Sequence, residues 1–439
     1  MSTTVNRREL FRRMANPAVF DSDSVSTRSG ERSNNLTNKQ QVARFLTQAT
    51  LGADINLIDY VDSIGIEAWL DEQFATPQSQ ILDAIYNIFP VEEIATSSPD
   101  RSVFRYALWD AMMMGDDLLR QRVALALSEI FVVSTENSDL YSFGNGIGDY
   151  YDMLLGNAFA NFRDLLYDVT MHPIMGTFLS HAGNRKTSLG QGRFPDENYA
   201  REIMQLFTIG LFLLNEDGSL QLDENNEPIP TYDNSHITEF AKIFTGITYD
   251  HDGDPTINYD ADIVSSWLNA YTSARPMKVF EDEHEPGPKT LLNGYVVSGG
   301  STLQDVNEAL DHLFNHPNVG PFIGRQLIQR LVKSNPTPEY ISRITAVFKK
   351  NGSGIRGDLE AVFRAILLDE EARDPSYMEH PTAGKLREPF FRYVHLFRAF
   401  NFSNPQNQYW DAGWTLQDEL RQYMFNAPSV FNFFSPDYT

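Results

Sequence analysis

Residues 37–50 read TNKQQVARFLTQAT, and this stretch gives the clearest indication of the fold. It opens with Thr37, a residue type that caps helix N-termini, and continues with apolar side chains spaced three and four residues apart. These apolar residues are Val42, Phe45, Leu46 and Ala49. Such a stripe is typical of an amphipathic helix that packs one face on a core.

The same helical period continues along most of the chain. It covers about residues 54–63, 66–74, 101–114, 116–133, 158–170, 195–213, 234–247, 301–315, 319–333, 336–350, 356–370, 382–400 and 414–424. Gly and Pro residues such as Gly65, Gly156 and Pro317 stand near the ends of these segments. The pattern predicts a mainly α fold, a multi-helix globular domain over residues 36–439 with short connections.

Two stretches interrupt the helical period. Residues 215–232 carry turn signals at Asp217-Gly218 and at residues 224–226, with a short alternation between them, and predict a small β-hairpin insertion. Residues 248–300 are rich in Asp, Gly, Pro and Tyr and predict a long, irregular acidic loop. Loops of that length in a compact domain are usually functional or mobile.

The composition describes a packed, acidic protein. The chain has 439 residues, a formal charge of −24 and 42% hydrophobic positions, which favours a folded chain over a disordered one. An anionic surface repels phosphate, so we expect no nucleic acid among the partners. No apolar run is long enough for a membrane span. Cysteine is absent, which excludes disulfides, thiolate catalysis and Cys-based metal sites.

The N-terminus and the surface composition bear on localisation. Residues 6–12, NRRELFR, are similar to a twin-arginine export signal, but polar residues follow where that signal needs an apolar stretch. Residues 1–35 are therefore predicted to be a disordered basic leader, with a degenerate export signal as the alternative. An acidic surface poor in lysine stays hydrated in salty surroundings. These features together favour a periplasmic or secreted protein.

The segment 195–213 holds the strongest candidate for a reactive site. Pro195 suits the first helical position, and polar residues then recur every three or four positions on an otherwise apolar helix. This polar stripe consists of Asn198, Arg201, Glu202, Gln205 and Thr208. It predicts an internal site in which Glu202 acts as acid, base or metal ligand. A buried Arg–Glu network and a solvent-facing stripe are the two alternatives.

The histidines supply candidate proton carriers. Three of the nine precede proline, at positions 172, 316 and 380, and each such pair is predicted to mark a helix start. His172 is the first candidate to approach Glu202, with His181 nearby in sequence. His312 and His316 have the spacing of a helical metal pair, but Pro317 places His316 beyond the helix end.

The long loop offers two further candidates. Residues 284–290, HEPGPKT, fail both the zinc-protease and the phosphate-loop patterns, but a Pro-Gly turn there would present His284 and Lys289 in a binding loop. Asp250, Asp252 and Asp254 alternate as calcium ligands do, although the sequence lacks the glycine and bidentate positions of an EF-hand. A looser Ca²⁺ site and a solvated loop are the two interpretations.

Two arginines stand on a strongly apolar helix, LLRQRVALALSEIFVV at 118–133. Arg120 and Arg122 are predicted to form structural ion pairs, with Glu129 as the acidic partner on the same helix, and anion binding is the alternative.

These residues together resemble the bacterial domain-of-unknown-function family 1800, over about residues 40–439. The resemblance rests on RQRVAL at 120–125, DENYARE at 196–202, AKIFTG at 241–246, PG at 286–287, KTL at 289–291, HP at 316–317 and PSVFNFFSP at 428–436. It implies a largely helical protein without an established activity, often exported, whose genes neighbour those of another uncharacterised family. A protein encoded by a neighbouring gene is therefore the implied partner. The family often has histidines in the segment matching Ser128 to Ile130 and at the position of Phe207, and this chain has none there.

Two functional hypotheses follow from the sequence. The first is a non-catalytic extracytoplasmic or envelope-associated protein that binds a partner through the loop 248–300. The second is a hydrolase or transferase with a pocket around Asn198, Arg201 and Glu202 and with His172 or His284 as proton carrier. No known catalytic signature is complete, and for this reason the first is favoured.

Overall fold

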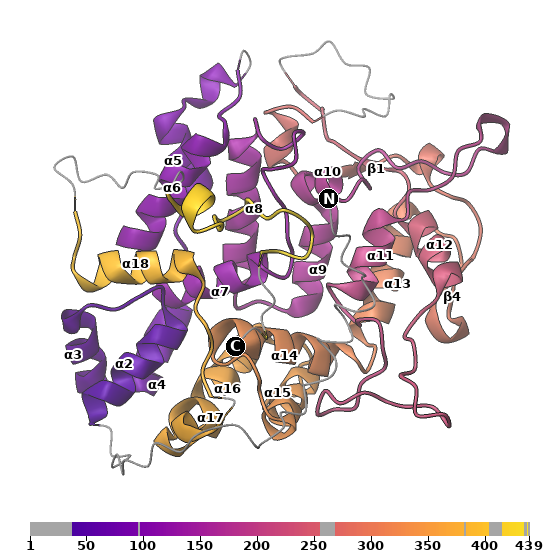
Figure 1. The fold of residues 1–439 in the computed structure, drawn as a ribbon. Coiled ribbons are helices and arrows are strands. Elements are labelled where there is room, and N and C mark those ends of the chain that lie inside the picture. The colour runs from indigo at the N-terminus through magenta and orange to yellow at the C-terminus, as the bar shows by residue number, and fades with distance from the viewer. Residues whose placement is uncertain are drawn as a thin grey trace.

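The computed structural model describes residues 37–94, 97–254, 268–381, 383–403, 415–433 and 437. Over these residues the protein is mainly α with a small β component, which confirms the predicted fold class (Figure 1). The α-helices are α2 (Asn38–Ala49), α3 (Ile55–Ile64), α4 (Ile66–Ala75), α5 (Ile81–Ile88), α6 (Arg101–Met114), α7 (Leu118–Ser128), α8 (Gly144–Gly156), α9 (Phe162–Met171), α10 (Pro173–Phe178), α11 (Asn198–Gln205), α12 (Asn234–Ile243), α13 (Thr302–Phe314), α14 (Val319–Leu331), α15 (Pro338–Lys349), α16 (Leu359–Leu368), α17 (Glu370–Arg373) and α18 (Pro389–Ala399).

The regular strands lie in the long loop between α12 and α13. Strand β1 (Ile247–Thr248) pairs antiparallel with β2 (Lys278–Val279), and β3 (Lys289–Thr290) pairs antiparallel with β4 (Val296–Val297). The described part of the loop is thus more regular than predicted. Its residues 255–267 lie outside the described residues, as does the leader 1–35 with its export-signal resemblance. Both predicted turns of the 215–232 insertion are present. An isolated antiparallel bridge closes each of them, Leu214–Leu220 across the first and Leu222–Pro228 across the second.

Helix boundaries follow local chemistry where caps are present. Thr37 forms a capping box with Gln40 at the start of α2, as the opening stretch predicts. Helix α11 is shorter than predicted, because it begins at Asn198, after Pro195, and ends at Gln205. Gly210, further along, adopts a left-handed conformation with φ of +71°. His172 caps α10 as predicted, whereas no helix starts at His380.

Two helices that the sequence period misses meet each other. Helix α8 carries glycines at its start, and a Cβ at Gly148 would lie 2.3 Å from Cδ1 of Ile85 on α5. Helix α5 in turn begins under Asp152 of α8, whose two carboxylate oxygens accept hydrogen bonds from the Ile81 and Leu82 amides at 2.8 Å. The glycines of α8 therefore allow close packing against neighbouring segments.

The hydrophobic core is one cluster that runs from α2 to the C-terminal segment, with α7 and α8 near its centre (Figure 1). The segment 422–427 near the C-terminus packs on this core. Tyr423 accepts a hydrogen bond at 2.6 Å from the indole of Trp109 on α6. Phe425 stacks edge-on against Phe104 and Tyr151. No helix among the described residues is long and apolar enough to cross a membrane.

Candidate functional site

The polar stripe of α11 enters the protein interior. Glu202 and Thr208 are 0% exposed, and Gln205 is almost as deeply buried. The solvent-facing alternative is therefore wrong for these three side chains. Gln205 accepts a hydrogen bond from the Tyr232 hydroxyl at 3.2 Å, and Thr208 donates to the carbonyl of Ile203.

The other end of the stripe lies at the surface. Asn198 and Arg201 are half-buried, and Arg201 lies 3.3 Å from Glu197, one turn earlier. Glu197 also accepts a hydrogen bond from Thr238 of α12 at 2.9 Å. The i,i+4 pair directs Arg201 toward the start of its own helix, and the contact between Glu197 and Thr238 joins α11 to α12.

The two histidines proposed as proton carriers have other partners. His172 accepts a hydrogen bond from the Ile174 amide, and its Nε2 lies 3.3 Å from Asp149 Oδ2. His284 lies in a separate cluster with Asp305. These contacts give each histidine a structural role, and the catalytic roles proposed for Asn198, Arg201, Glu202 and His172 remain predictions.

His181 lies beside α11 on its apolar side. Its ring stacks on Tyr199 with centroids 3.9 Å apart, and its Nε2 donates to the carbonyl of Thr170 at 2.8 Å. The Tyr199 hydroxyl is 2.7 Å from the Thr170 hydroxyl. Burial lowers the pKa of His181 to about 4, so this imidazole is neutral near pH 7.

The structure brings His284 and Lys289 together, with Asp305 of α13 as their shared partner. Lys289 Nζ lies 2.6 Å from Asp305 Oδ2 and 3.1 Å from His284 Nε2, and it donates to the carbonyl of Glu285 at 2.6 Å. His284 Nδ1 is 3.0 Å from the Thr245 carbonyl, which can only accept, so Nδ1 donates in that contact. Nε2 of the same ring lies 3.1 Å from Asp305 Oδ2.

We call Lys289, His284 and Asp305 the buried triad. The side chains of Lys289 and Asp305 are fully buried. Burial alone would raise the pKa of Asp305, but the hydrogen bonds from Lys289 and His284 outweigh it and hold this pKa below its ordinary value. The turn at residues 284–290 thus points these side chains inward, where the sequence interpretation expected a turn that presents them to a ligand.

The three aspartates of the long loop turn to different partners. Asp250 pairs with Arg275 at 2.7 Å, and Asp252 pairs with Lys278 at 2.7 Å. Asp254 is buried 3.1 Å from His251 and accepts a hydrogen bond from Asn269 at 2.7 Å. Among the described residues no group of three or more His, Asp or Glu side chains is placed to hold a metal ion, and the Ca²⁺ site stays an untested prediction.

Arg120 and Arg122 take different positions on α7. Arg120 donates to the carbonyl of Leu155 at 2.8 Å and lies over the ring of Phe159. Arg122 is fully buried over the ring of Phe391 and donates to the carbonyl of Arg330, which itself pairs with Glu129 at 3.2 Å. Burial lowers the pKa of Arg122 to about 10, and carboxylates near it offset only part of that effect.

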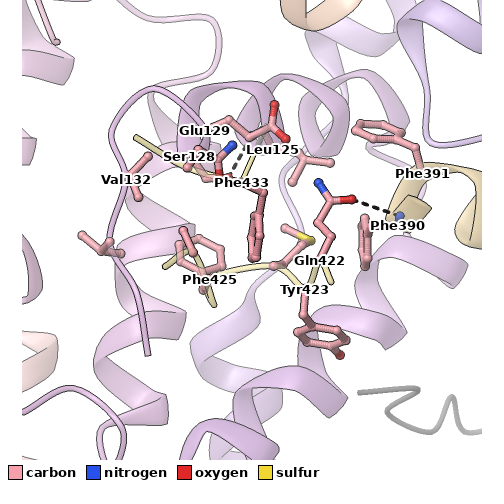
Figure 2. Close-up of a pocket in the computed structure, with 14 residues that line it drawn as sticks. Leu125, Ser128, Glu129, Val132, Phe390, Phe391, Gln422, Tyr423, Phe425 and Phe433 are labelled. Atoms are coloured by element: carbon pink, nitrogen blue, oxygen red, sulfur yellow. Dashed lines mark hydrogen bonds between the residues drawn. The ribbon is translucent and has the colours of Figure 1, made fainter. Parts of the chain in front are cut away.

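Glu129 also lines a cavity at the end of α7 (Figure 2). The cavity measures about 30 Å³, which is room for a single water but not for a substrate. Its wall is aromatic, and Figure 2 shows Phe433 beside Ser128 and Gln422 joined to Phe390. Phe131, which directly follows the segment 128–130, packs on Phe207 with centroids 5.1 Å apart, so the two places where the resemblance implies histidines lie near each other.

Sequence reasoning missed Asp305, Glu371 and Glu388, the carboxylates that hold buried lysines. Asp305 pairs with Lys289, Glu371 with Lys333 at 3.0 Å, and Glu388 with Lys385 at 3.0 Å. Asp305 had one available signal, because it shares an otherwise apolar helix face with Val306 and Ala309. An acidic residue on such a face indicates a buried partner.

Comparison with known proteins gives one match. The family model for a protein of unknown function, DUF1800, matches residues 44–439, and the chain therefore belongs to that family. No curated protein and no solved structure matches the chain.

Proposed function

We propose that this member of the DUF1800 family is a non-catalytic, extracytoplasmic binding protein that recognises a partner protein. We place the contact surface on residues 185–194, here called the arm, and on residues 281–285 of the long loop. The observation that carries the proposal is a firmly held projection with two large apolar side chains that are mostly exposed to solvent.

The arm is the segment RKTSLGQGRF, which lies between α10 and α11 and extends from the edge of the helical body (Figure 1). Ser188 and Arg193 form an antiparallel bridge across its turn. Leu189 is 80% exposed and Phe194 is 68% exposed. Single exposed apolar residues are common, but two large ones on one short turn are typical of contact sites.

The long loop holds the arm in place. Arg185 and Arg193 both pair with Glu283, at 3.3 and 3.7 Å. The Lys186 amide donates to the carbonyl of Glu283 at 2.9 Å, and the Thr187 amide donates to the Glu285 carboxylate at 2.6 Å. Residue 284, between these anchors, belongs to the buried triad. A surface fixed in this way loses little conformational entropy on binding.

The charge of the arm indicates the chemistry of its partner. The arm holds three cations and no acidic residue in a chain of net charge −24. Arg185 and Arg193 remain partly exposed beside Glu283. A partner with an apolar socket and an acidic rim matches both features, because rim charges set orientation and association rate while the apolar anchors supply affinity.

Site-specific photo-crosslinking tests this proposal. A photoreactive phenylalanine analogue replaces Phe194 or Leu189, and a matched control replaces Leu222, which is 50% exposed on the separate 215–232 insertion. In cells that express the chain with its neighbouring genes, we expect one discrete protein adduct from positions 189 and 194 and none from 222. Leu189→Asp should abolish the adduct at 194.

Three results would reject the contact surface: no adduct from the arm, equal labelling from position 222, or labelling of lipid alone. Circular dichroism of each variant checks that the helical fold is retained, so that loss of an adduct reports binding.

A further inference from the structure

A second cavity lies on the opposite side of the fold from the arm's anchors, between α2, the end of α14 and α17. Its volume is about 250 Å³, close to the lower bound of about 300 Å³ for small-molecule sites. Its lining combines charged and apolar residues: Arg44, Gln48, Val332, Lys333, Glu371, Tyr377, Met378, Ala383 and Gly384. A cavity of this size admits a ligand of roughly ten non-hydrogen atoms.

The carboxylate in this cavity is already matched. Glu371 lies 3.0 Å from Lys333, and both side chains are almost completely buried. Glu371 also accepts a hydrogen bond from the Thr337 hydroxyl and lies 3.5 Å from Arg343. Its negative charge therefore does not serve as the counter-charge for Arg44.

Arg44 presents one edge of its guanidinium without a protein partner. Its Nη1 donates to the backbone carbonyls of Arg373 and Asp374, at 3.2 and 3.4 Å. Nε and Nη2 have no hydrogen-bond partner among the described residues. Burial lowers the pKa of Arg44, and the nearby Asp374 carboxylate offsets this only in part.

We propose that this cavity binds a small organic carboxylate. The Nε–Nη2 edge of Arg44 is the fork that pairs with two carboxylate oxygens, and Lys333 adds a second positive charge on the wall. Val332, Met378 and Ala383 supply an apolar wall for the rest of the molecule. That wall favours a monocarboxylate with a short apolar tail over inorganic phosphate, because phosphate has no apolar part to place against it.

Isothermal titration calorimetry at low salt tests the site with defined probes. The probes are benzoate, isovalerate, inorganic phosphate and benzamide, the last a neutral analogue of benzoate of nearly equal size. We expect saturable binding of benzoate or isovalerate and at least tenfold weaker binding of benzamide and phosphate.

Variants then locate the binding. Arg44→Lys keeps the charge but loses the fork, and should weaken carboxylate binding about tenfold or more. Lys39→Gln is the matched control, because Lys39 is an exposed cation on the same helix that pairs with Asp59. Thermal unfolding of Arg44→Lys confirms that the protein is folded during the titration.

The proposal is overturned if neither carboxylate binds saturably, if benzamide binds as well as benzoate, or if phosphate displaces benzoate. It is equally overturned if Arg44→Lys binds carboxylate as the unmodified protein does.

Discussion

The substitution Lys289→Met probes the buried triad most directly. Methionine is similar to lysine in length and fills the same space, so the change removes the charge with little loss of packing. In the native protein the ammonium of Lys289 meets Asp305, His284 and the carbonyl of Glu285. The variant leaves a buried carboxylate without its cation and a buried carbonyl without its donor.

The expected cost follows from this geometry. Removing one partner of a buried ion pair costs about 3–5 kcal/mol. His284 Nε2, 3.1 Å from Asp305, remains as a polar partner of the carboxylate and limits the loss. We therefore expect a loss of about 3 kcal/mol. With an unfolding entropy of about 2.1 cal/mol/K per residue over 439 residues, this lowers Tm by about 3 °C.

Urea denaturation and backbone hydrogen exchange measure this effect. The control is Lys278→Met, since Lys278 pairs with Asp252 at 2.7 Å in the same loop but both side chains are partly exposed. That pair should contribute less than about 1 kcal/mol. In Lys289→Met, exchange should rise first in residues 284–297, because the triad joins this segment to α13.

A stability loss in Lys289→Met no larger than that in Lys278→Met would refute this account of the triad. A rise in hydrogen exchange that is equal across all helices would refute the local role of the triad. A double variant, Lys289→Met with Asp305→Asn, should recover part of the stability, because the unpaired buried charge is then absent.

Two further predictions concern pH. Burial lowers the native pKa of His181 to about 4 from 6.5, so the unfolded chain binds the extra proton and stability falls as pH drops from about 6.5 to 4, by up to about 3 kcal/mol. His181→Gln should reduce this slope in urea midpoints by that share, His316 with a similarly lowered pKa should keep its own, and the exposed His380→Gln should leave the slope in place. Asp152 gives a pH dependence of the opposite sign. Burial raises its native pKa to about 7 from 3.8, so the native state holds the extra proton and stability falls as pH rises from about 4 to 7, by up to about 4 kcal/mol. Asp152→Asn should flatten that fall in thermal scans, Asp71→Asn on the surface should leave it in place, and an unchanged slope in Asp152→Asn would contradict the assignment.

The sequence predicts elements whose signals are local. The capping residue and stripe of α2 lie within fourteen positions, and the structure has both. The spacing also groups Glu202 with the polar stripe, but it leaves a solvent-facing stripe open, and only the structure shows that Glu202 is enclosed. Helix α8 could not be predicted in this way. Its glycines lower helix propensity, and the close approach of other segments, such as Ile85 to Gly148, is visible only in the structure.

Partnerships between distant residues carry no such signal. His284 and Lys289 are close in sequence to each other, but the carboxylate that draws them inward is Asp305, on a helix that follows two more strands. The HEPGPKT turn resembles ligand-binding loops, but its sequence alone does not show which way the side chains point. Tertiary pairing decides that direction, and it can be found only once α13 is in place.

Several titratable side chains are buried in this protein although no catalytic signature is complete, and their ion pairs give them a structural role. Lys289, Lys333 and Lys385 each meet a carboxylate, on α13, on α17 and at the start of α18 respectively. Ion pairs of this kind fix geometry more than they add stability, because each charge must first be desolvated. This is consistent with the proposed binding function, which needs the irregular segments kept in one conformation. Arg44 departs from this pattern: its Nη1 donates to backbone carbonyls, and its side chain lines a cavity. Backbone carbonyls bring no negative charge to within hydrogen-bond distance of this guanidinium, and for this reason the proposed carboxylate site is assigned to Arg44 and not to the paired lysines.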